Sequence, residues 1–179
     1  MFLNEQTIII MDMAIFIEIQ SESLKMTNRQ GSFSKILVAI DGSEASMDAA
    51  NYAIEMARKD NANLIGLTVL DLSKPRYLTA SFIAAPTYGL RELQGLKERA
   101  QKWLDNVATL AHKSNIQFKS QIIEDSLSVE SSILDYAENE NIDLIVIGTR
   151  GMSGFKKMLL GSVASKIVSY SSCPVLVVK

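Results

Sequence analysis

Five short apolar runs are spaced along the chain, and amphipathic segments separate them. The runs are residues 36–40, 64–70, 118–123, 142–147 and 174–178. In the first run every position from Ile36 to Ile40 is apolar, which is typical of a strand buried on both faces, as in a parallel sheet. The pattern therefore predicts five strands, of which the third is the most polar.

The segments between the runs carry apolar residues at spacings of three and four, which predicts helices. The predicted helices span about 43–59, 93–111, 129–137 and 162–170. Each connection between successive strands contains one predicted helix, as in a crossover between parallel strands. The expected fold is therefore a doubly wound five-stranded parallel sheet with helices on both faces. Residues 71–90, which include Pro75 and Pro86, are expected to form an irregular contact loop or lid.

The N-terminal segment differs from the rest of the chain. Its apolar stretch is interrupted by Asp12 and Glu18 and is too short for a membrane span. It also lacks the basic start and the small-residue cleavage site of a secretory signal. We expect an N-terminal extension over 1–32 and a domain over 33–179. Residues 1–25 are either a strand or short helix docked on the domain or a leader upstream of a start at Met26, and we expect them to be dispensable.

Composition limits the range of functions. The 179 residues fit one domain, and 47% hydrophobic with 21% charged residues are enough for a buried core and a solvated surface. The net charge of −2 argues against a nucleic-acid or membrane-surface partner. One cysteine excludes an internal disulfide and a cysteine-rich zinc site, and a cytoplasmic location is expected.

A glycine-rich segment follows the fourth predicted strand. Gly148, Gly151 and Gly154 recur at every third position, and Gly161-Ser162 opens the last predicted helix. Glycines allow backbone amides to approach a ligand closely, and a helix N-terminus favours a phosphate. The segment is either a phosphate site or a set of tight turns, and Ser162 either caps the helix or donates its hydroxyl to a phosphate.

Charged residues near the predicted strand ends also have two interpretations. Arg150, between two glycines, is expected to neutralise phosphate charge, whereas Lys156 and Lys157 are more typical of a solvated loop. Asp41 directly follows the first strand and is a candidate ligand-binding residue. With Glu44 three positions later, Asp41 also resembles the start of a helix-capping box.

Several enzyme signatures do not occur in the sequence. There is no G-x-x-x-x-G-K-[ST], which excludes a P-loop hydrolase, and the first turn lacks the G-x-G-x-x-G of dinucleotide oxidoreductases. A phosphoacceptor receiver would need more acidic residues near Asp41, and only Glu124-Asp125 follows the third strand. No nucleophile, general base or metal cluster accompanies the glycine segment, so at most slow hydrolysis of a bound phosphate compound is expected.

Residues 33–179 resemble the universal stress protein family, in its ATP-binding type. The resemblance rests on residues 36–43, 143–151, 161–163 and 173–178. The spacing of Gly148, Gly151 and Gly161-Ser162 is similar to the family's ATP-binding pattern. This resemblance implies strand order 3-2-1-4-5, a homodimer formed through the last strand, and ATP, with Mg²⁺, or AMP lying across the ends of the first and fourth strands.

The resemblance also implies individual contacts. Asp41 and the backbone of Val69 would face the adenine end of the nucleotide. The residues that would hold the ribose and the phosphates are Gly148, Gly151, Gly161, Ser162 and Val163. The chain departs from the family at Ala164, where ATP-binding members often have a second hydroxyl residue.

Two functions follow from these observations. The first is a nucleotide-binding regulatory module of the stress response that acts as a dimer. The alternative is a non-enzymatic scaffold or chaperone-like interaction protein of the same fold with an empty or AMP-type site. Ala164 and the long segment 71–90 motivate the alternative.

Overall fold

All five predicted strands and all four predicted helices are present in the computed structural model, which describes residues 8–12, 15–17, 32–72, 86–125, 128–151 and 160–179. The strands are β3 (Lys35–Ala39), β4 (Asn63–Asp71), β5 (Phe118–Asp125), β6 (Leu144–Gly148) and β7 (Val175–Val178). The helices are α1 (Glu44–Asp60), α4 (Pro86–Lys113), α5 (Val129–Asn139) and α6 (Ser162–Tyr170).

These five strands are parallel neighbours in the order β5-β4-β3-β6-β7. Numbered by their place among the five, this is the expected order 3-2-1-4-5, and the prediction is confirmed. The chain first builds from β3 towards β4 and β5, then returns to the other side of β3 to place β6 and β7. The strand order therefore reverses between β3 and β6, where an open α/β sheet usually binds its ligand.

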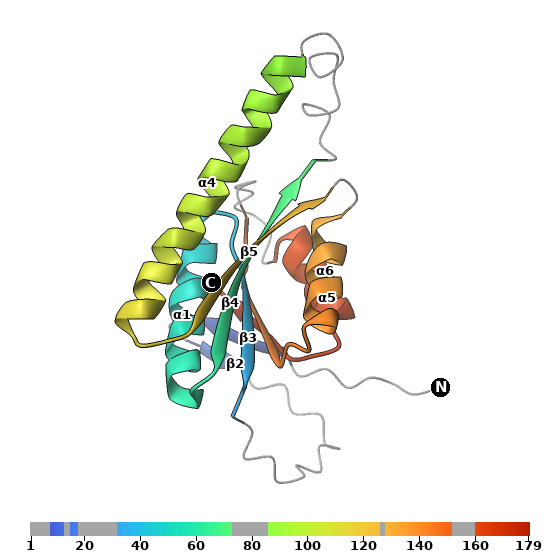
Figure 1. The fold of residues 1–179 in the computed structure, drawn as a ribbon. Helices are drawn as coiled ribbons and strands as arrows, with labels where there is room; N and C mark the ends of the chain where they lie inside the picture. The colour runs from blue at the N-terminus through green and yellow to red at the C-terminus, as the bar shows by residue number, and fades with distance from the viewer. Residues whose placement is uncertain (1–7, 13–14, 18–31, 73–85, 126–127, 152–159) are drawn as a thin grey trace.

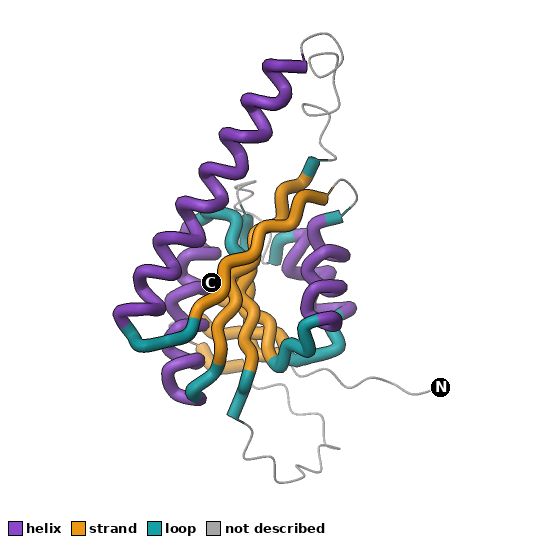
Figure 2. The backbone as a smooth tube through the Cα atoms, in the orientation of Figure 1, coloured by secondary structure: helices purple, strands orange, loops and turns teal. Residues whose placement is uncertain are grey.

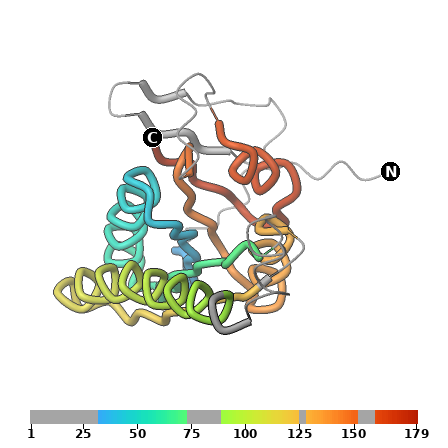
Figure 3. Tube along the Cα trace, turned by 90° about the horizontal axis from the view of Figure 1, so that it is seen from above, coloured from blue at the N-terminus to red at the C-terminus, as the bar shows by residue number. Residues whose placement is uncertain are grey.

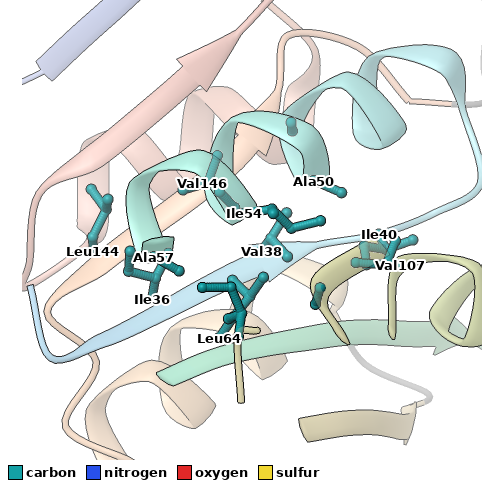
Figure 4. Packing of buried hydrophobic residues seen from close by; sticks show 14 of the residues in the cluster. Ile36, Val38, Ile40, Ala50, Ile54, Ala57, Leu64, Val107, Leu144 and Val146 are labelled. Atoms are coloured by element: carbon teal, nitrogen blue, oxygen red, sulfur yellow. The ribbon is translucent and has the colours of Figure 1, made fainter. Parts of the chain in front are cut away.

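Helices cover both faces of the sheet (Figures 1 and 2), with α1 and α4 on one side and α5 and α6 on the other, as the view from above also shows (Figure 3). Alternate strand residues face the two sides, because side chains of a strand point to opposite faces in turn. The first buried cluster, part of which is drawn in Figure 4, includes Ile36, Val38, Ile40, Ala53, Ile54, Leu64, Val107, Leu144 and Val146. The second includes Leu37, Ile65, Leu67, Ile133, Ile145, Ile147, Ala164, Ile167 and Val177.

Two further strands extend the sheet beyond β7. Strand β1 (Ile8–Asp12) runs parallel to β7, with Ile8 opposite Val175 and Met11 opposite Val178. Strand β2 (Ile15–Ile17) pairs antiparallel with β1 and forms the edge. The N-terminal segment thus contributes docked strands, one of the alternatives in the sequence analysis, and β7 is not an edge strand of this sheet.

Helix α4 begins earlier than the sequence pattern suggested. The stretch 71–90 was expected to be irregular, yet β4 continues to Asp71 and α4 begins at Pro86. Proline suits the first position of a helix, because its missing N–H would have no partner there and its φ is already helical. The expectation was therefore wrong for 86–90, and residues 73–85 lie outside the described residues. The first turns of α4 project beyond the ends of the strands (Figure 1).

Membrane insertion was also examined. Within the described ranges, no helix combines the length and the apolar character needed to cross a bilayer.

Candidate functional site

The turn after β3 is held by hydrogen bonds between its own polar side chains. Asp41 Oδ1 accepts from the backbone N–H of Ser43 at 2.9 Å and from its hydroxyl at 2.6 Å. Ser43 is the N-cap of α1, and its Oγ accepts from the N–H of Ser46 at 3.2 Å. The capping-box interpretation of Asp41 and Glu44 is therefore wrong, because the cap is Ser43 and Asp41 orients that cap.

The loop after β6 lies directly against this turn. A Cβ placed on Gly151 would lie 2.6 Å from Asp41 Oδ2, so the Gly151 backbone and the Asp41 carboxylate are neighbours. Ser43 Oγ lies 3.4 Å from the carbonyl oxygen of Arg150. The fold thus brings together two motifs that lie about a hundred residues apart, as predicted from the reversal of strand order.

Gly148, the last residue of β6, meets a packing requirement. A Cβ at this position would lie 2.7 Å from both the carbonyl carbon and the carbonyl oxygen of Ala45, in the first turn of α1. Real Cβ atoms do not approach backbone atoms so closely. Glycine is therefore needed here for the close contact of β6 with α1, whatever ligand the site holds.

Thr149 joins the end of the sheet to the start of α6. Its N–H donates to the carbonyl of Val178 at 2.6 Å, and its carbonyl accepts from the N–H of Gly161 at 2.7 Å. Thr149 itself is buried. These bonds hold the N-terminus of α6 beside the carboxyl end of β6.

The N-terminus of α6 has no side-chain cap. Gly161 is the N-cap residue, and Ser162 is the first residue of the helix rather than its cap, so the capping interpretation of Ser162 is wrong. The first turn also contains no acidic residue. Since the first N–H groups of a helix lack intrahelical partners and lie at its positive end, this terminus is suited to an anion.

The next residues of α6 alternate between surface and core. Ser162 and Ser165 are exposed, whereas Ala164 is only 3% exposed and belongs to the second buried cluster. Val163 is half-buried and packs against the same cluster. Ser162 is thus free to reach a ligand through its hydroxyl, and Val163 only through its backbone.

Arg150 supplies positive charge between the two loops. Its Nε is buried and has no hydrogen-bond partner among the described residues. A Cβ placed on Gly161 would lie 3.7 Å from the Cα of Arg150, so the arginine adjoins the start of α6. A buried guanidinium donor without a partner is costly unless an acceptor completes it. Arg150 and the α6 N-terminus together fit an anionic group.

Val69, another residue of the predicted site, lies half-buried on β4, two positions beyond Leu67, which is the register partner of Ala39. Asp41 lies two positions beyond Ala39, after the end of β3. A contact of the Val69 backbone with a nucleotide stays a prediction. Gly154, Lys156 and Lys157 lie outside the described residues.

Other reactive side chains do not join this site. In the part of the chain that the structure describes, no group of three or more His, Cys, Asp or Glu residues is arranged to hold a metal ion. Burial raises the pKa of the Cys173 thiol, which disfavours its nucleophilic thiolate form. Cys173 packs against the second buried cluster, as a small apolar residue does.

Known proteins resemble this chain in sequence and in fold. The sequence profile of the universal stress protein family matches residues 32–179. The chain belongs to the universal stress protein family. A universal stress protein of Methanocaldococcus jannaschii is 35% identical over 154 residues, which are 85% of this chain and 85% of that protein. The resemblance seen in the sequence is therefore confirmed.

Solved structures of the family share the fold. The universal stress protein UspA from Lactobacillus plantarum has a TM-score of 0.68 and 29% identity, covering 83% of this chain and 99% of that one. A universal stress protein in complex with cAMP has a TM-score of 0.57 and 23% identity, covering 83% of this chain and 98% of that one. At that identity the second comparison shows the fold alone. Other structures with this fold contain dAMP or AMP.

Two residues that organise the site are not among those predicted for it. Ser43 begins the first predicted helix without being named as its N-cap, although a serine just before an amphipathic helix is a usual N-cap signal. Thr149 lies between two residues of the predicted site, Gly148 and Arg150. Its role depends on backbone hydrogen bonds to Val178 and Gly161, for which the sequence carries no local signal.

Proposed function

We propose that the chain binds an adenine nucleotide across the carboxyl ends of β3 and β6. The observation that carries the proposal is the buried Nε of Arg150, which has no partner within the described ranges, on a residue that adjoins the uncapped N-terminus of α6. A phosphate would accept hydrogen bonds from both. Gly151 and Gly161 would allow the backbone to approach, with Ser162 donating its hydroxyl and the amide of Val163 nearby.

The other end of the nucleotide would lie over the neighbouring strands. Asp41, just after β3, and the backbone of Val69, on the neighbouring strand β4, would face the base and the sugar. Gly148 would contribute its backbone at the end of β6. Proteins with the same fold occur in complex with cAMP, dAMP or AMP, which supports a nucleotide as the ligand. We propose ATP as the preferred ligand, with Mg²⁺ carried mainly by its phosphate oxygens.

Binding of ATP is expected to raise the melting temperature of the dialysed protein. A ligand that binds only the folded state stabilises it by about 2.7 kcal/mol at a hundred times its Kd.

Arg150→Met should weaken ATP binding about tenfold, because a charged hydrogen bond contributes about 1.5–3 kcal/mol. Thermal shift with ATP–Mg²⁺ and with AMP gives the measurement. Arg58→Met is the control, since Arg58 is an exposed residue of α1 paired with Glu55.

Absence of any shift at millimolar ATP would count against the proposal, as would equal binding by the Arg150→Met variant. A shift with AMP alone would favour the second candidate function, a scaffold or chaperone-like protein with an AMP-type site. The observation that favours this alternative is Ala164, whose methyl group is buried in the core and offers no hydroxyl to a terminal phosphate.

For the cell, we propose a cytoplasmic regulatory role in the stress response, in which nucleotide occupancy changes a surface that other copies or partners recognise. Association of two copies through β7 would need the edge that β1 occupies in the full chain. We therefore propose that this homodimer belongs to the chain without its first 25 residues.

A shortened chain of residues 26–179 is expected to fold and to dimerise, whereas the full chain stays monomeric. Removing β1 exposes the four apolar residues of β7 with unpaired backbone groups, and such an edge pairs readily with another strand. Light scattering on both chains measures the mass, and urea unfolding verifies that the shorter chain is folded. Equal masses for the two chains would contradict this expectation.

A further inference from the structure

Trp103, the one tryptophan of the chain, contacts the turn that carries Asp41. It lies on α4, and its ring faces Gly42. A Cβ placed on Gly42 would fall 2.2 Å from Trp103 Cε2 and 2.4 Å from Cζ2. Gly42 also has a φ of +82°, a conformation that favours glycine. The turn therefore fits against the indole with no space between them.

The two residues that flank Gly42 in this turn contact the glycine loop. Asp41 Oδ2 lies beside Gly151, and Ser43 Oγ lies 3.4 Å from the carbonyl oxygen of Arg150. A continuous set of contacts thus runs from α4 through Trp103 and the turn to the residues proposed to hold phosphate. The turn has few ways to move while the indole is in place.

Trp103 packs, half-buried, against the first buried cluster. The contact with Gly42 adds a second role. Any large apolar residue could pack against the core at this position. The contact with the turn, in contrast, needs a flat ring, because the Cα of Gly42 approaches the face of the indole.

We propose that Trp103 is a positioning residue of the nucleotide site, which holds the Asp41–Ser43 turn in its binding geometry and links the site to α4. This inference rests on the proposed nucleotide binding. Ligand binding then changes the surroundings of the indole, and loss of the indole loosens the turn and weakens binding.

The test uses the full chain, with ATP–Mg²⁺ and AMP as probes and equilibrium dialysis as the measure of Kd. Trp103→Leu is expected to raise the Kd about tenfold, while Trp103→Phe, which keeps a flat ring, retains most of the affinity. Ile116→Ala is the control, because it removes a buried side chain of the same cluster, just beyond the C-terminal end of α4. It should lower the midpoint of urea unfolding and leave the Kd unchanged.

Fluorescence gives a second readout that a purely structural role would not move. Because Trp103 is the single tryptophan, its emission should change saturably during the titration, with the midpoint found by dialysis. Wild-type affinity in Trp103→Leu, or an emission that stays constant while ATP binds, would overturn the inference and leave the proposed function standing. A wild-type chain that binds neither probe in dialysis would overturn both.

Discussion

Gly148→Ala is expected to lower the free energy of unfolding by about 3 kcal/mol, at the upper end of the usual cost of overpacking. The added Cβ would lie 2.7 Å from the backbone carbon and oxygen of Ala45. These atoms belong to the first turn of α1 and cannot rotate away as a side chain can. Either β6 or α1 must therefore shift, and the buried contacts between them are lost. Urea unfolding followed by circular dichroism measures the change.

Gly95→Ala is the matched control for this prediction. Gly95 lies within α4, and a Cβ there would meet nothing closer than the flexible end of Arg99, at 3.9 Å. Alanine is the better helix former, so this change should raise the free energy of unfolding by about 0.5–1 kcal/mol. If both variants were equally stable, the close contact between residue 148 and the Ala45 backbone would not limit the size of the side chain at this position.

The sequence predicted those parts of the fold that depend on local pattern. Apolar runs such as 144–147, flanked by amphipathic segments, have one stable arrangement, a parallel sheet with helices on both faces. The position of the candidate site followed from the same topology, because the strand order reverses next to β3. The prediction of an irregular stretch was wrong from Pro86 onward, because proline is found both where helices are interrupted and where they begin.

Contacts between distant segments were not predictable in this way. The pairing of β1 with β7 joins residues more than 160 positions apart, and nothing local at Ile8–Asp12 selects that partner. The contact of Trp103 with Gly42 depends on how α4 lies across the sheet. The burial of the Arg150 Nε, with no acceptor among the residues that the structure describes, is a property of the folded surroundings. Such features need the tertiary structure, because sequence periodicity determines which face is buried but not what lies opposite.

The glycine segment shows how one motif combines two requirements. Gly148 is needed for packing against Ala45, while Gly151 lets the backbone approach Asp41 and Gly161 lies close to Thr149 and Arg150. Sequence spacing alone left tight turns and phosphate binding as alternatives for all of these glycines. The structure gives Gly148 a packing reason, because its Cβ would clash with a helix backbone. Phosphate binding by Gly151 and Gly161 stays a prediction. The uncapped N-terminus of α6 is then the place where stability and ligand binding are expected to oppose each other.

Gly161→Asp is expected to stabilise the protein and at the same time to weaken ATP binding at least a hundredfold. Gly161 is the N-cap of α6 and has an extended backbone that aspartate also adopts. A carboxylate there would accept from the first N–H groups and lie at the positive end of the helix, which should add about 0.5–1 kcal/mol to the free energy of unfolding. The same carboxylate would occupy the proposed phosphate position and repel the phosphates.

Gly161→Ala separates charge from bulk in this prediction. Its Cβ would lie 3.3 Å from the carbonyl oxygen of Thr149, the same close contact that aspartate makes, but it has no group to cap the helix or repel an anion. Urea unfolding and equilibrium dialysis with ATP–Mg²⁺ measure both quantities for the three proteins. Alanine should lower stability slightly, since it is a poor N-cap, and reduce affinity only severalfold. An aspartate variant that bound ATP as tightly as the wild type would place the phosphates away from α6, because no anion can share those N–H groups with a carboxylate.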